Sequence, residues 1–519
     1  MPSIGDRYAG NSLKPSDAAK ALATDHLLTD LRGRSVRGGA VTFGAQAGKV
    51  LLQLATVVVL VRLLPPGAFG LIAMVAALSA VLEFVKELGL SAATIRDTDI
   101  THAQVSALFW INAAAGALIA LILFLAAPLI ASFYHEAAVT AVTRWLALSF
   151  LMSGLTVQHW ALLRRQMRFT ATISVDIGGD LAGLIAAVIL ALSGVGYWAL
   201  VAQRLVVPAI ALIGSWSLCR WRPAWPRPAA GVRELFAFGM SVTAVNITAA
   251  IGRSVDQILI GWAWGADVLG LYERAAKLLL TPINNLAVPL YAVGMPTLSR
   301  IVHQDARYRR AFNELFENLA MIALPSAALL ATTADWAVRI LFGARWAAAA
   351  PLVAWFAASA AFLPLIQTAG LLYLSQNRPY EMLRAGSVDL ALCVLAVGAG
   401  LHAGAAAVAA ALAVVGLGLR LPIGLWLATR RGPVRLGDLS VALVPALTAA
   451  LAVGTAVLAL RWLVLPAETP ALPGALLAIL IAVAAAGAIY AALPRSRRAL
   501  HGLGRLVHEL RGQQPALKA

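Results

Sequence analysis

Long apolar runs alternate with short polar segments along the chain, beginning after a polar stretch of 39 residues. Each run is close to the roughly 20 residues that an α-helix needs to cross the hydrocarbon core of a bilayer. The pattern therefore predicts an all-α integral membrane protein with fourteen transmembrane helices. The predicted spans are residues 40–62, 70–90, 106–132, 141–162, 174–193, 197–218, 235–262, 268–292, 312–334, 349–374, 384–402, 405–428, 438–463 and 470–493.

The charges of the connecting segments test this count independently of hydropathy. Every second connector contains arginine, with three at each of 164–168 and 430–435, whereas the intervening connectors hold few cations. Cytoplasmic loops of membrane proteins are enriched in Lys and Arg. The arginine-rich side is therefore predicted to be cytoplasmic, and with fourteen crossings both termini lie on that side.

The first twelve spans contain a weak internal repeat. Phe43-Gly44, Gly70-Leu71 and Gln166 of the first half recur as Phe238-Gly239, Gly270-Leu271 and Gln376 in the second half. Because six spans separate the copies, both have the same orientation, as in parallel repeats about an axis along the membrane normal. The predicted organisation is a cytoplasmic tail (1–39), an N-lobe of six helices (40–218), a basic cytoplasmic linker (219–234), a C-lobe of six helices (235–428), two C-terminal helices (438–493) and a basic cytoplasmic tail (494–519).

Composition and charge narrow the functional classes. The chain is 61% hydrophobic and only 13% charged, which excludes a water-soluble enzyme because soluble domains are about 45–50% apolar. Its net charge of +17 would suggest nucleic acid in a soluble protein, but in a membrane protein it reflects topology and anionic lipid. The two cysteines, Cys219 and Cys393, provide neither a disulfide framework nor a metal site. No cofactor, metal or nucleic acid is predicted.

Polar side chains inside the spans are the candidates for function, because an embedded charge costs about 2.5–3.5 kcal/mol by insertion scales. Spans 1, 2, 7 and 8, which correspond under the repeat, carry the clearest polar faces and are predicted to line a central cavity. A cavity rich in cations suits an anionic substrate, whose oxygens Arg can bind bidentately. The candidate cations are Lys49, Arg253, Lys277 and Arg274, and the candidate polar lining is Gln46, Gln53, Asn246, Asn284 and Asn285. The alternative is that these cations form structural ion pairs, as Arg253 could with Asp256.

Embedded carboxylates have two interpretations. They can bind a coupling ion, which is a common device of transporters, or they can serve as local partners of an arginine. The residues concerned are Glu83, Asp176, Asp180, Asp256 and Asp389. Pro282 and Pro289 lie in span 8, where each removes a helix hydrogen bond, and they predict a hinge.

Several segments, taken in their order along the chain, resemble those of a known family. They are VRLLPPGAFGLIAM (61–74), ELGLSAATIR (87–96), LLRRQMRF (162–169), GVGYWALVAQ (194–203), SVDQILIGWAWGADVLGLYERAAKL (254–278) and FGARWAAAAPL (342–352). Their order and spacing are similar to those of Wzx-type polysaccharide transporters (oligosaccharide flippases) of the multidrug/oligosaccharidyl-lipid/polysaccharide (MOP) exporter superfamily. The resemblance covers residues of about 38 to 435 and supplies no catalytic motif.

The resemblance implies a bacterial inner-membrane flippase, not an enzyme, that moves polyprenyl-diphosphate-linked oligosaccharide outward by alternating access for exopolysaccharide, capsule or O-antigen assembly. Its expected partners are this lipid-linked substrate, membrane lipids and polysaccharide polymerase or export machinery. The diphosphate would pair with the candidate cations. Three alternatives remain open: a lipid-linked peptidoglycan precursor flippase, a multidrug antiporter and a membrane polysaccharide polymerase. A multidrug antiporter would need more carboxylates in the cavity to bind cationic drugs. A polymerase would need a longer extracellular loop than the one at 335–348.

Overall fold

The computed structural model describes residues 48–87, 90–96, 100–225, 236, 254–466 and 469–493. The chain divides into two compact units, each considered by itself below. Unit 1 comprises Met1–Leu63 and Val75–Ile251, and unit 2 comprises Leu64–Met74 and Gly252–Ala519. The helix α4 (Pro66–Glu87) therefore begins in unit 2 and ends in unit 1.

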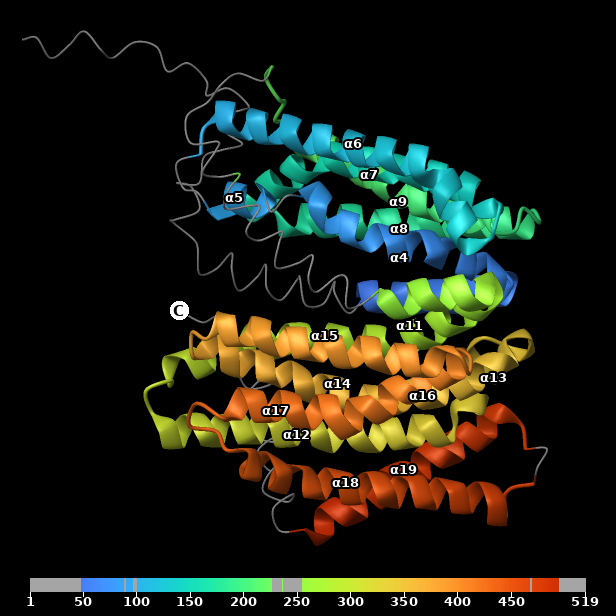
Figure 1. Cartoon of the computed structure of the whole chain (residues 1–519), viewed down its shortest axis with the longest axis vertical. Helices are drawn as coiled ribbons and strands as arrows, with labels where there is room; N and C mark the ends of the chain where they lie inside the picture. Colours follow the sequence, from blue (N-terminus) through green and yellow to red (C-terminus); the bar gives the residue numbers. More distant parts are fainter. Residues whose placement is uncertain are drawn as a thin grey trace, which may run out of the picture. The chain divides into compact units, whose positions relative to one another are not determined.

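Unit 1 is a bundle of antiparallel helices (Figure 1). A helix over 48–63 and the later part of α4 are followed by α5 (Leu90–Arg96), α6 (His102–Tyr134), α7 (Ala138–Arg165), α8 (Phe169–Leu192) and α9 (Trp198–Leu218). Thr101 and Gln104 close the start of α6 with a capping box, in which each side chain accepts a hydrogen bond from the other residue's backbone N–H. The helices α6 and α7 approach closely because Gly116 and Gly154 face each other's backbone without side chains.

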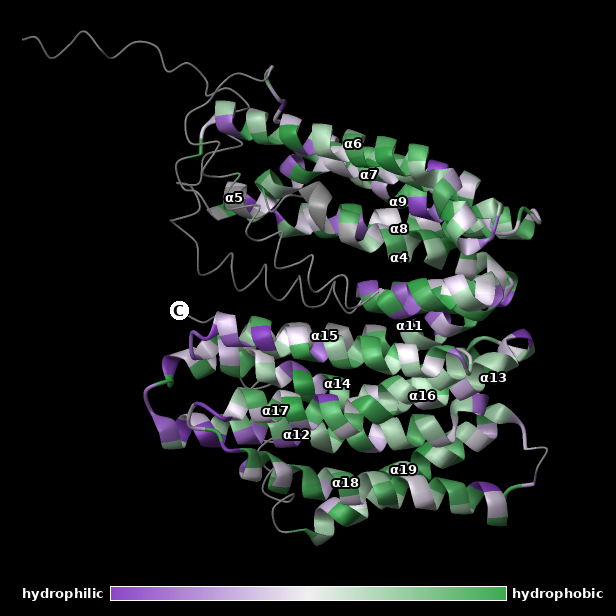
Figure 2. Ribbon diagram, viewed as in Figure 1, coloured by the Kyte–Doolittle hydropathy of each residue, from purple (hydrophilic) through white to green (hydrophobic). Residues whose placement is uncertain are grey.

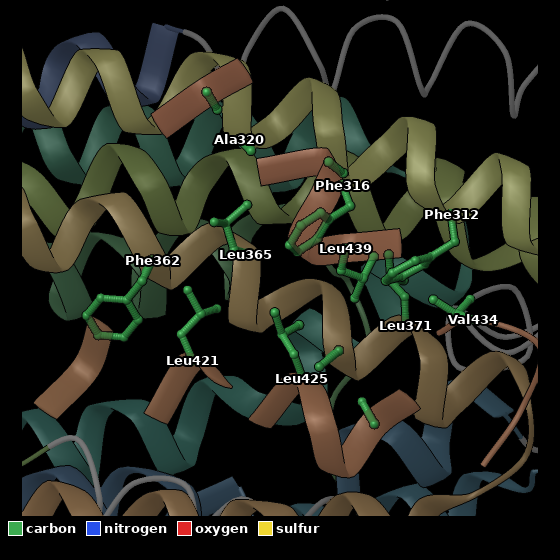
Figure 3. Close-up of a cluster of buried hydrophobic side chains, with 14 of the residues drawn as sticks. Phe312, Phe316, Ala320, Phe362, Leu365, Leu371, Leu421, Leu425, Val434 and Leu439 are labelled. Atoms are coloured by element: carbon green, nitrogen blue, oxygen red, sulfur yellow. The ribbon is translucent and has the colours of Figure 1, made fainter. Parts of the chain in front are cut away.

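Unit 2 contains the longer run of helices. In order these are α11 (Val255–Arg300), α12 (Asp305–Thr332), α13 (Ala334–Leu341), η1 (Ala344–Ala349), α14 (Ala350–Ser375), α15 (Pro379–Leu401), α16 (Ala405–Val415), η2 (Gly416–Arg420), α17 (Leu421–Thr429), α18 (Leu436–Ala459), η3 (Leu460–Val464) and α19 (Ala471–Ala492). The segments η2 and η3 are short π-helical turns that continue α16 into α17 and extend α18. The core of unit 2 brings Phe312 and Phe316 of α12 against Leu371 of α14, Leu425 of α17 and Leu439 of α18 (Figure 3).

Ten helices in the described part of the chain are long and apolar enough to cross a membrane. They match the predicted spans 3–6 and 9–14 to within several residues. Large apolar side chains on them point outward, as Leu125 at 66% and Leu480 at 67% exposed do. Figure 2 shows hydrophobic residues along the lengths of the helices, with hydrophilic residues at ends such as the start of α12. The chain is a multi-pass membrane protein with an all-α fold, whereas the exact number of fourteen helices and the two-lobe repeat stay predictions.

The predicted spans 7 and 8 meet in α11. Gly265, with φ of 76° and ψ of −175°, is the point at which helical geometry breaks within α11, and a positive φ of this kind is readily adopted by glycine. Backbone geometry remains helical through Pro282 and Pro289. The hinge predicted at these prolines concerns motion during transport, so it stays a prediction.

A close helix crossing lies inside unit 2, between the start of α4 and the part of α11 that follows Gly265. A Cβ added to Gly70 would lie 1.7 Å from the carbonyl oxygen of Ala266, and one added to Gly270 would lie 1.9 Å from that of Pro66. Backbone therefore packs directly on backbone at both positions. Gly70 and Gly270 are also the two glycines that correspond under the sequence repeat.

Candidate functional site

The clearest candidate site lies in unit 1, where two residues predicted for separate roles form an ion pair. Lys49 Nζ lies 3.4 Å from the Oδ2 atom of Asp176, and their side chains are 28% and 40% exposed. Lys49 belongs to the helix over 48–63 and Asp176 to α8. Asp180 follows one turn later on α8, and its Oδ2 is buried without a hydrogen-bond partner among the described residues. The sequence had assigned Lys49 to the substrate and the two carboxylates to a coupling ion or an ion pair.

A cavity of about 220 Å³, lined by both polar and apolar side chains, opens beside this pair. Four helices of unit 1 (α5, α7, α8 and α9) supply its walls. The lining residues are Ser91, Ser153, Thr156, Val157, Trp160, Ala161, Arg164, Asp176, Pro208 and Ala211. Asp176 thus belongs both to the ion pair and to the cavity wall.

The helix α7 supplies most of the cavity's polar surface. Ser153, Thr156, Trp160 and Arg164 recur at spacings of three and four residues, so that they share one helical face. The guanidinium of Arg164 lies 5.6 Å from the centre of the Trp160 ring, a distance at which a cation is attracted to the ring face. Trp160 lies near the end of a predicted span and Arg164 in an arginine-rich connector, and their shared helical spacing is the signal that could have placed them in one site.

The residues that follow α9 are held against α6. Trp221 is fully buried and donates a hydrogen bond of 2.9 Å to Nδ1 of His102. Trp110 donates to the carbonyl oxygen of Ala224, whose N–H donates to Ser106. The beginning of the predicted linker is therefore part of unit 1, whereas residues 226–235 lie outside the described part.

A second charged cluster lies in unit 2, on α11. The Glu273 carboxylate, with a side chain only 4% exposed, accepts hydrogen bonds of 2.5 and 2.9 Å from Arg274 and is also paired with Lys277. Arg274 is 12% exposed and lies over the ring of Phe69 at 4.6 Å, whereas Lys277 is 42% exposed. Sequence reasoning missed Glu273, although its i, i+4 spacing to Lys277 is the usual signal of a helical ion pair.

Two further embedded carboxylates of unit 2 have partners. Arg420, on the π-helical turn η2, donates hydrogen bonds of 2.7 and 2.9 Å to the two oxygens of Asp389 on α15. Tyr272 donates a hydrogen bond of 2.8 Å to Oδ2 of Asp256, whose Oδ1 is buried without a partner among the described residues. Asp389 is thus the partner of an arginine in this structure. The pair lies at a π-helical turn, and such turns are frequent at functional sites.

The structure places the other predicted site residues as follows. Gln53 is half-buried in the helix over 48–63, and Glu83 is exposed on α4. Gln46, Asn246 and Arg253 lie outside the described residues, as do the side chains of Pro282, Asn284, Asn285 and Pro289. In unit 1 the described candidates Lys49 and Asp176 are paired, and in unit 2 Arg274 and Lys277 contact Glu273. Asp256 and Asp389 have the other partners given above.

An ion pair joins α13, which lies between two of the candidate membrane spans, to η3 at the end of another. Both terminal nitrogens of Arg461 donate hydrogen bonds of 2.8 Å to the carboxylate of Asp335, and the guanidinium covers the ring of Trp336 at 4.4 Å. Burial raises the pKa of Asp335, but the hydrogen bonds and charge of Arg461 outweigh it and hold this pKa below its ordinary value. The pair is therefore structural and salt-bridged at neutral pH.

Comparisons with known proteins identify relatives. Residues 59–351 match the model of the polysaccharide biosynthesis protein family. The teichuronic acid biosynthesis protein TuaB of Bacillus subtilis (strain 168) is 25% identical over 349 residues, which cover 66% of this chain and 72% of that protein. The succinoglycan biosynthesis transport protein ExoT of Rhizobium meliloti (strain 1021) is 27% identical over 332 residues, which cover 64% of this chain and 66% of that protein.

Solved structures share the fold. The lipid II flippase MurJ in an inward closed conformation matches with a TM-score of 0.66 at 13% identity, covering 88% of this chain and 99% of that one. An inward-facing multidrug resistance MATE family transporter of the MOP superfamily matches with a TM-score of 0.57 at 12% identity, covering 76% and 94%. These likenesses show that the chain has the fold of MOP transporters, as the sequence predicted.

Proposed function

The chain belongs to the polysaccharide biosynthesis protein family, and from that membership we propose that it is a flippase for polyprenyl-diphosphate-linked oligosaccharide. It moves this lipid from the cytoplasmic to the outer face of a bacterial inner membrane, with both of its own termini in the cytoplasm. The product serves exopolysaccharide, capsule or O-antigen assembly. Support comes from relatives named for polysaccharide biosynthesis and transport and from the MOP transporter fold.

The observation that carries the proposal furthest is the Lys49–Asp176 pair beside a cavity within membrane-spanning helices. Embedded charges are costly and usually face a water-filled path or a bundle interior. The Lys49 side chain is 28% exposed, so that a ligand can still reach it. A diphosphate, which carries more charge than one carboxylate, then competes for Lys49.

The cluster on α11 offers a second set of cations for the diphosphate. Lys277 is 42% exposed, so that a phosphate oxygen can approach it while Glu273 remains bound to Arg274. Arg253 completes the proposed set from the sequence. The amides Gln46, Gln53, Asn246, Asn284 and Asn285 would contact the sugars, and the carboxylates that these cations do not neutralise are the candidates for a coupled ion.

The electrical gradient favours the proposed direction. Moving one negative charge outward from a cell that is negative inside gains about 2.3 kcal/mol per 100 mV. The potential alone can therefore drive part of the cycle for an anionic diphosphate head group.

A reconstituted system tests the proposal. Liposomes containing the protein and a fluorescent undecaprenyl-diphosphate-linked sugar should show protein-dependent exchange between leaflets. The variant Lys49→Gln/Arg253→Gln/Lys277→Gln should flip the lipid at least about tenfold more slowly, because charge-assisted hydrogen bonds to phosphate contribute about 1.5–3 kcal/mol each. An unchanged rate in the triple variant would exclude these cations, and absence of any protein-dependent exchange would exclude flipping of this lipid.

A deletion strain gives an independent test in the cell. Loss of surface polysaccharide, with the lipid-linked oligosaccharide left facing the cytoplasm, is the expected phenotype. Intermediate that reaches the outer face but stays unpolymerised would instead indicate a polymerase.

A further inference from the structure

The cavity of unit 1 differs in chemistry from a phosphate site. Its wall contains one carboxylate (Asp176), one guanidinium (Arg164) and three hydroxyls (Ser91, Ser153 and Thr156), and Trp160 adds an aromatic surface. Thr156 already donates its hydrogen to the carbonyl oxygen of Met152 at 2.7 Å, so toward a ligand its oxygen acts as an acceptor. The wall therefore offers both donors and acceptors at close range.

The nature of this wall excludes several occupants. A lipid chain would displace water from the carboxylate, the guanidinium and the hydroxyls without offering them hydrogen bonds, which costs free energy. A phosphate inside the cavity would meet Asp176 directly, because Lys49 is not among the lining residues, and it would be repelled by oxygens that act only as acceptors when ionised. Drug-sized ligands need pockets of about 300–1,000 Å³, which is more than the 220 Å³ available.

A single sugar ring satisfies the same wall. Its hydroxyls donate to Asp176 and Thr156 and accept from Arg164, while its C–H face packs on the negatively charged face of the Trp160 ring. Asp176 can still accept hydrogen bonds from a sugar. Lys49 approaches its Oδ2 atom, and a carboxylate offers about four lone-pair positions in all. We propose that this cavity binds one sugar ring of the carrier-linked oligosaccharide, an inference that rests on the proposed flippase function.

The position of Asp176 specifies which ring this is. Asp176 joins the cavity to Lys49 across 3.4 Å, and Lys49 is a proposed partner of the diphosphate. A sugar held by one oxygen of Asp176 therefore lies next to a phosphate held by Lys49. The cavity therefore takes the sugar attached directly to the diphosphate.

Comparison of the sugar-free lipid with glycosylated lipids isolates the contribution of the sugar to binding. Native mass spectrometry of the purified full-length protein would measure dissociation constants for undecaprenyl diphosphate and for undecaprenyl-diphosphate-linked glucose and galactose. The wild type should bind at least one glycosylated lipid more tightly than the sugar-free lipid. Asp176→Asn should reduce this preference about tenfold, which is the size of a lost hydrogen bond to a charged group. Trp160→Ala should reduce it about three- to tenfold, because the sugar loses the ring face on which it packs. Sugar-free binding should stay within about twofold in Trp160→Ala, whereas Asp176→Asn frees Lys49 and should strengthen it.

Two controls guard against general disruption. Trp145 lies on the same helix but is 51% exposed and outside the cavity, so that Trp145→Ala should keep the full preference. Ser153→Cys, made with both native cysteines replaced by serine, should react with a water-soluble maleimide. The preferred glycosylated lipid should slow this reaction, and the sugar-free lipid should not.

The outcomes separate the two proposals. If no polyprenyl diphosphate lipid binds, the proposed function falls and the sugar site falls with it. If the sugar-free and glycosylated lipids bind wild type equally, the sugar site is wrong while the flippase function stands. The same conclusion follows if Trp160→Ala and Asp176→Asn keep the sugar preference and the Ser153→Cys variant is not protected from the maleimide.

Discussion

The crossing of α4 and α11 inside unit 2 predicts a large effect from the smallest substitution. Alanine at Gly70 would place a methyl group 1.7 Å from the carbonyl oxygen of Ala266, and alanine at Gly270 would place one 1.9 Å from that of Pro66. Unstrained Cβ contacts lie at 3.4–4 Å, so the two helix turns must separate by about 1.5 Å. The obstacle is backbone in both cases, and rotation of a side chain cannot relieve it.

Overpacking of this kind costs about 1–3 kcal/mol, occasionally more. We expect Gly270→Ala and Gly70→Ala each to fall at the upper end of that range, because separating the turns also loses the packing around the crossing. The double variant should lose little more than either single one, since the first methyl group already separates the turns that the second would clash with. Thermal unfolding of the purified protein in detergent, followed by the monodisperse fraction on size exclusion, measures the loss.

Gly178 is the matched control for these variants. It lies within α8, and a Cβ added there meets nothing within 4 Å. Gly178→Ala should leave the melting temperature unchanged or slightly higher, because alanine favours the helix by roughly 1 kcal/mol over glycine. If Gly270→Ala and Gly70→Ala melt with Gly178→Ala, the close crossing does not exist in the protein and the reasoning fails.

Three further predictions concern the ion pairs. Glu273→Gln leaves Arg274 nearly buried without its counter-charge and should destabilise the protein by about 3–5 kcal/mol, visible as a lower melting temperature that Glu273→Asp partly restores. Asp389→Asn likewise leaves a mostly buried guanidinium unpaired and should lower the melting temperature, whereas loss of both partners together should be milder; equal losses would argue against the pair. Because Arg461 holds the pKa of Asp335 below its ordinary value of about 3.9, the unfolded chain takes up the proton first. The pair's contribution to stability is therefore complete above that value and is lost as pH falls through the folded pKa. The melting temperature of Asp335→Asn should accordingly fall less than that of the wild type as the pH is lowered from about 5.

The fold was largely predictable because its signals are long. A membrane span is about 20 residues of one character, and the predicted boundaries of spans 3–6 and 9–14 agree with the helices to within several residues. The break between spans 7 and 8 was expected between residues 262 and 268, and Gly265 is where it occurs. What hydropathy lacks is any information on which helix lies beside which.

The candidate site was only partly predictable for that same reason. The embedded charges were found, but the partner of Lys49 lies far along the chain on α8, and no periodicity within one helix reports such a contact. Trp160 lies near the end of predicted span 4, where tryptophans are usually interfacial. Its place in a cavity depends on packing by α5, α8 and α9, which is a tertiary property.

One pair of glycines from the predicted sequence repeat, Gly70 and Gly270, lies at a helix crossing in the structure. Gly70-Leu71 and Gly270-Leu271 matched only as short dipeptides, yet the two glycines meet at one crossing, where each faces the carbonyl oxygen of the residue four positions before the other. Such reciprocal contacts arise where equivalent segments are related by a two-fold axis. They also explain why glycine is needed twice: a methyl group on either side would separate the same pair of helix turns. Gly70, whose added Cβ would lie closer to backbone than that of any other described glycine, is therefore on the helix that begins in unit 2 and ends in unit 1.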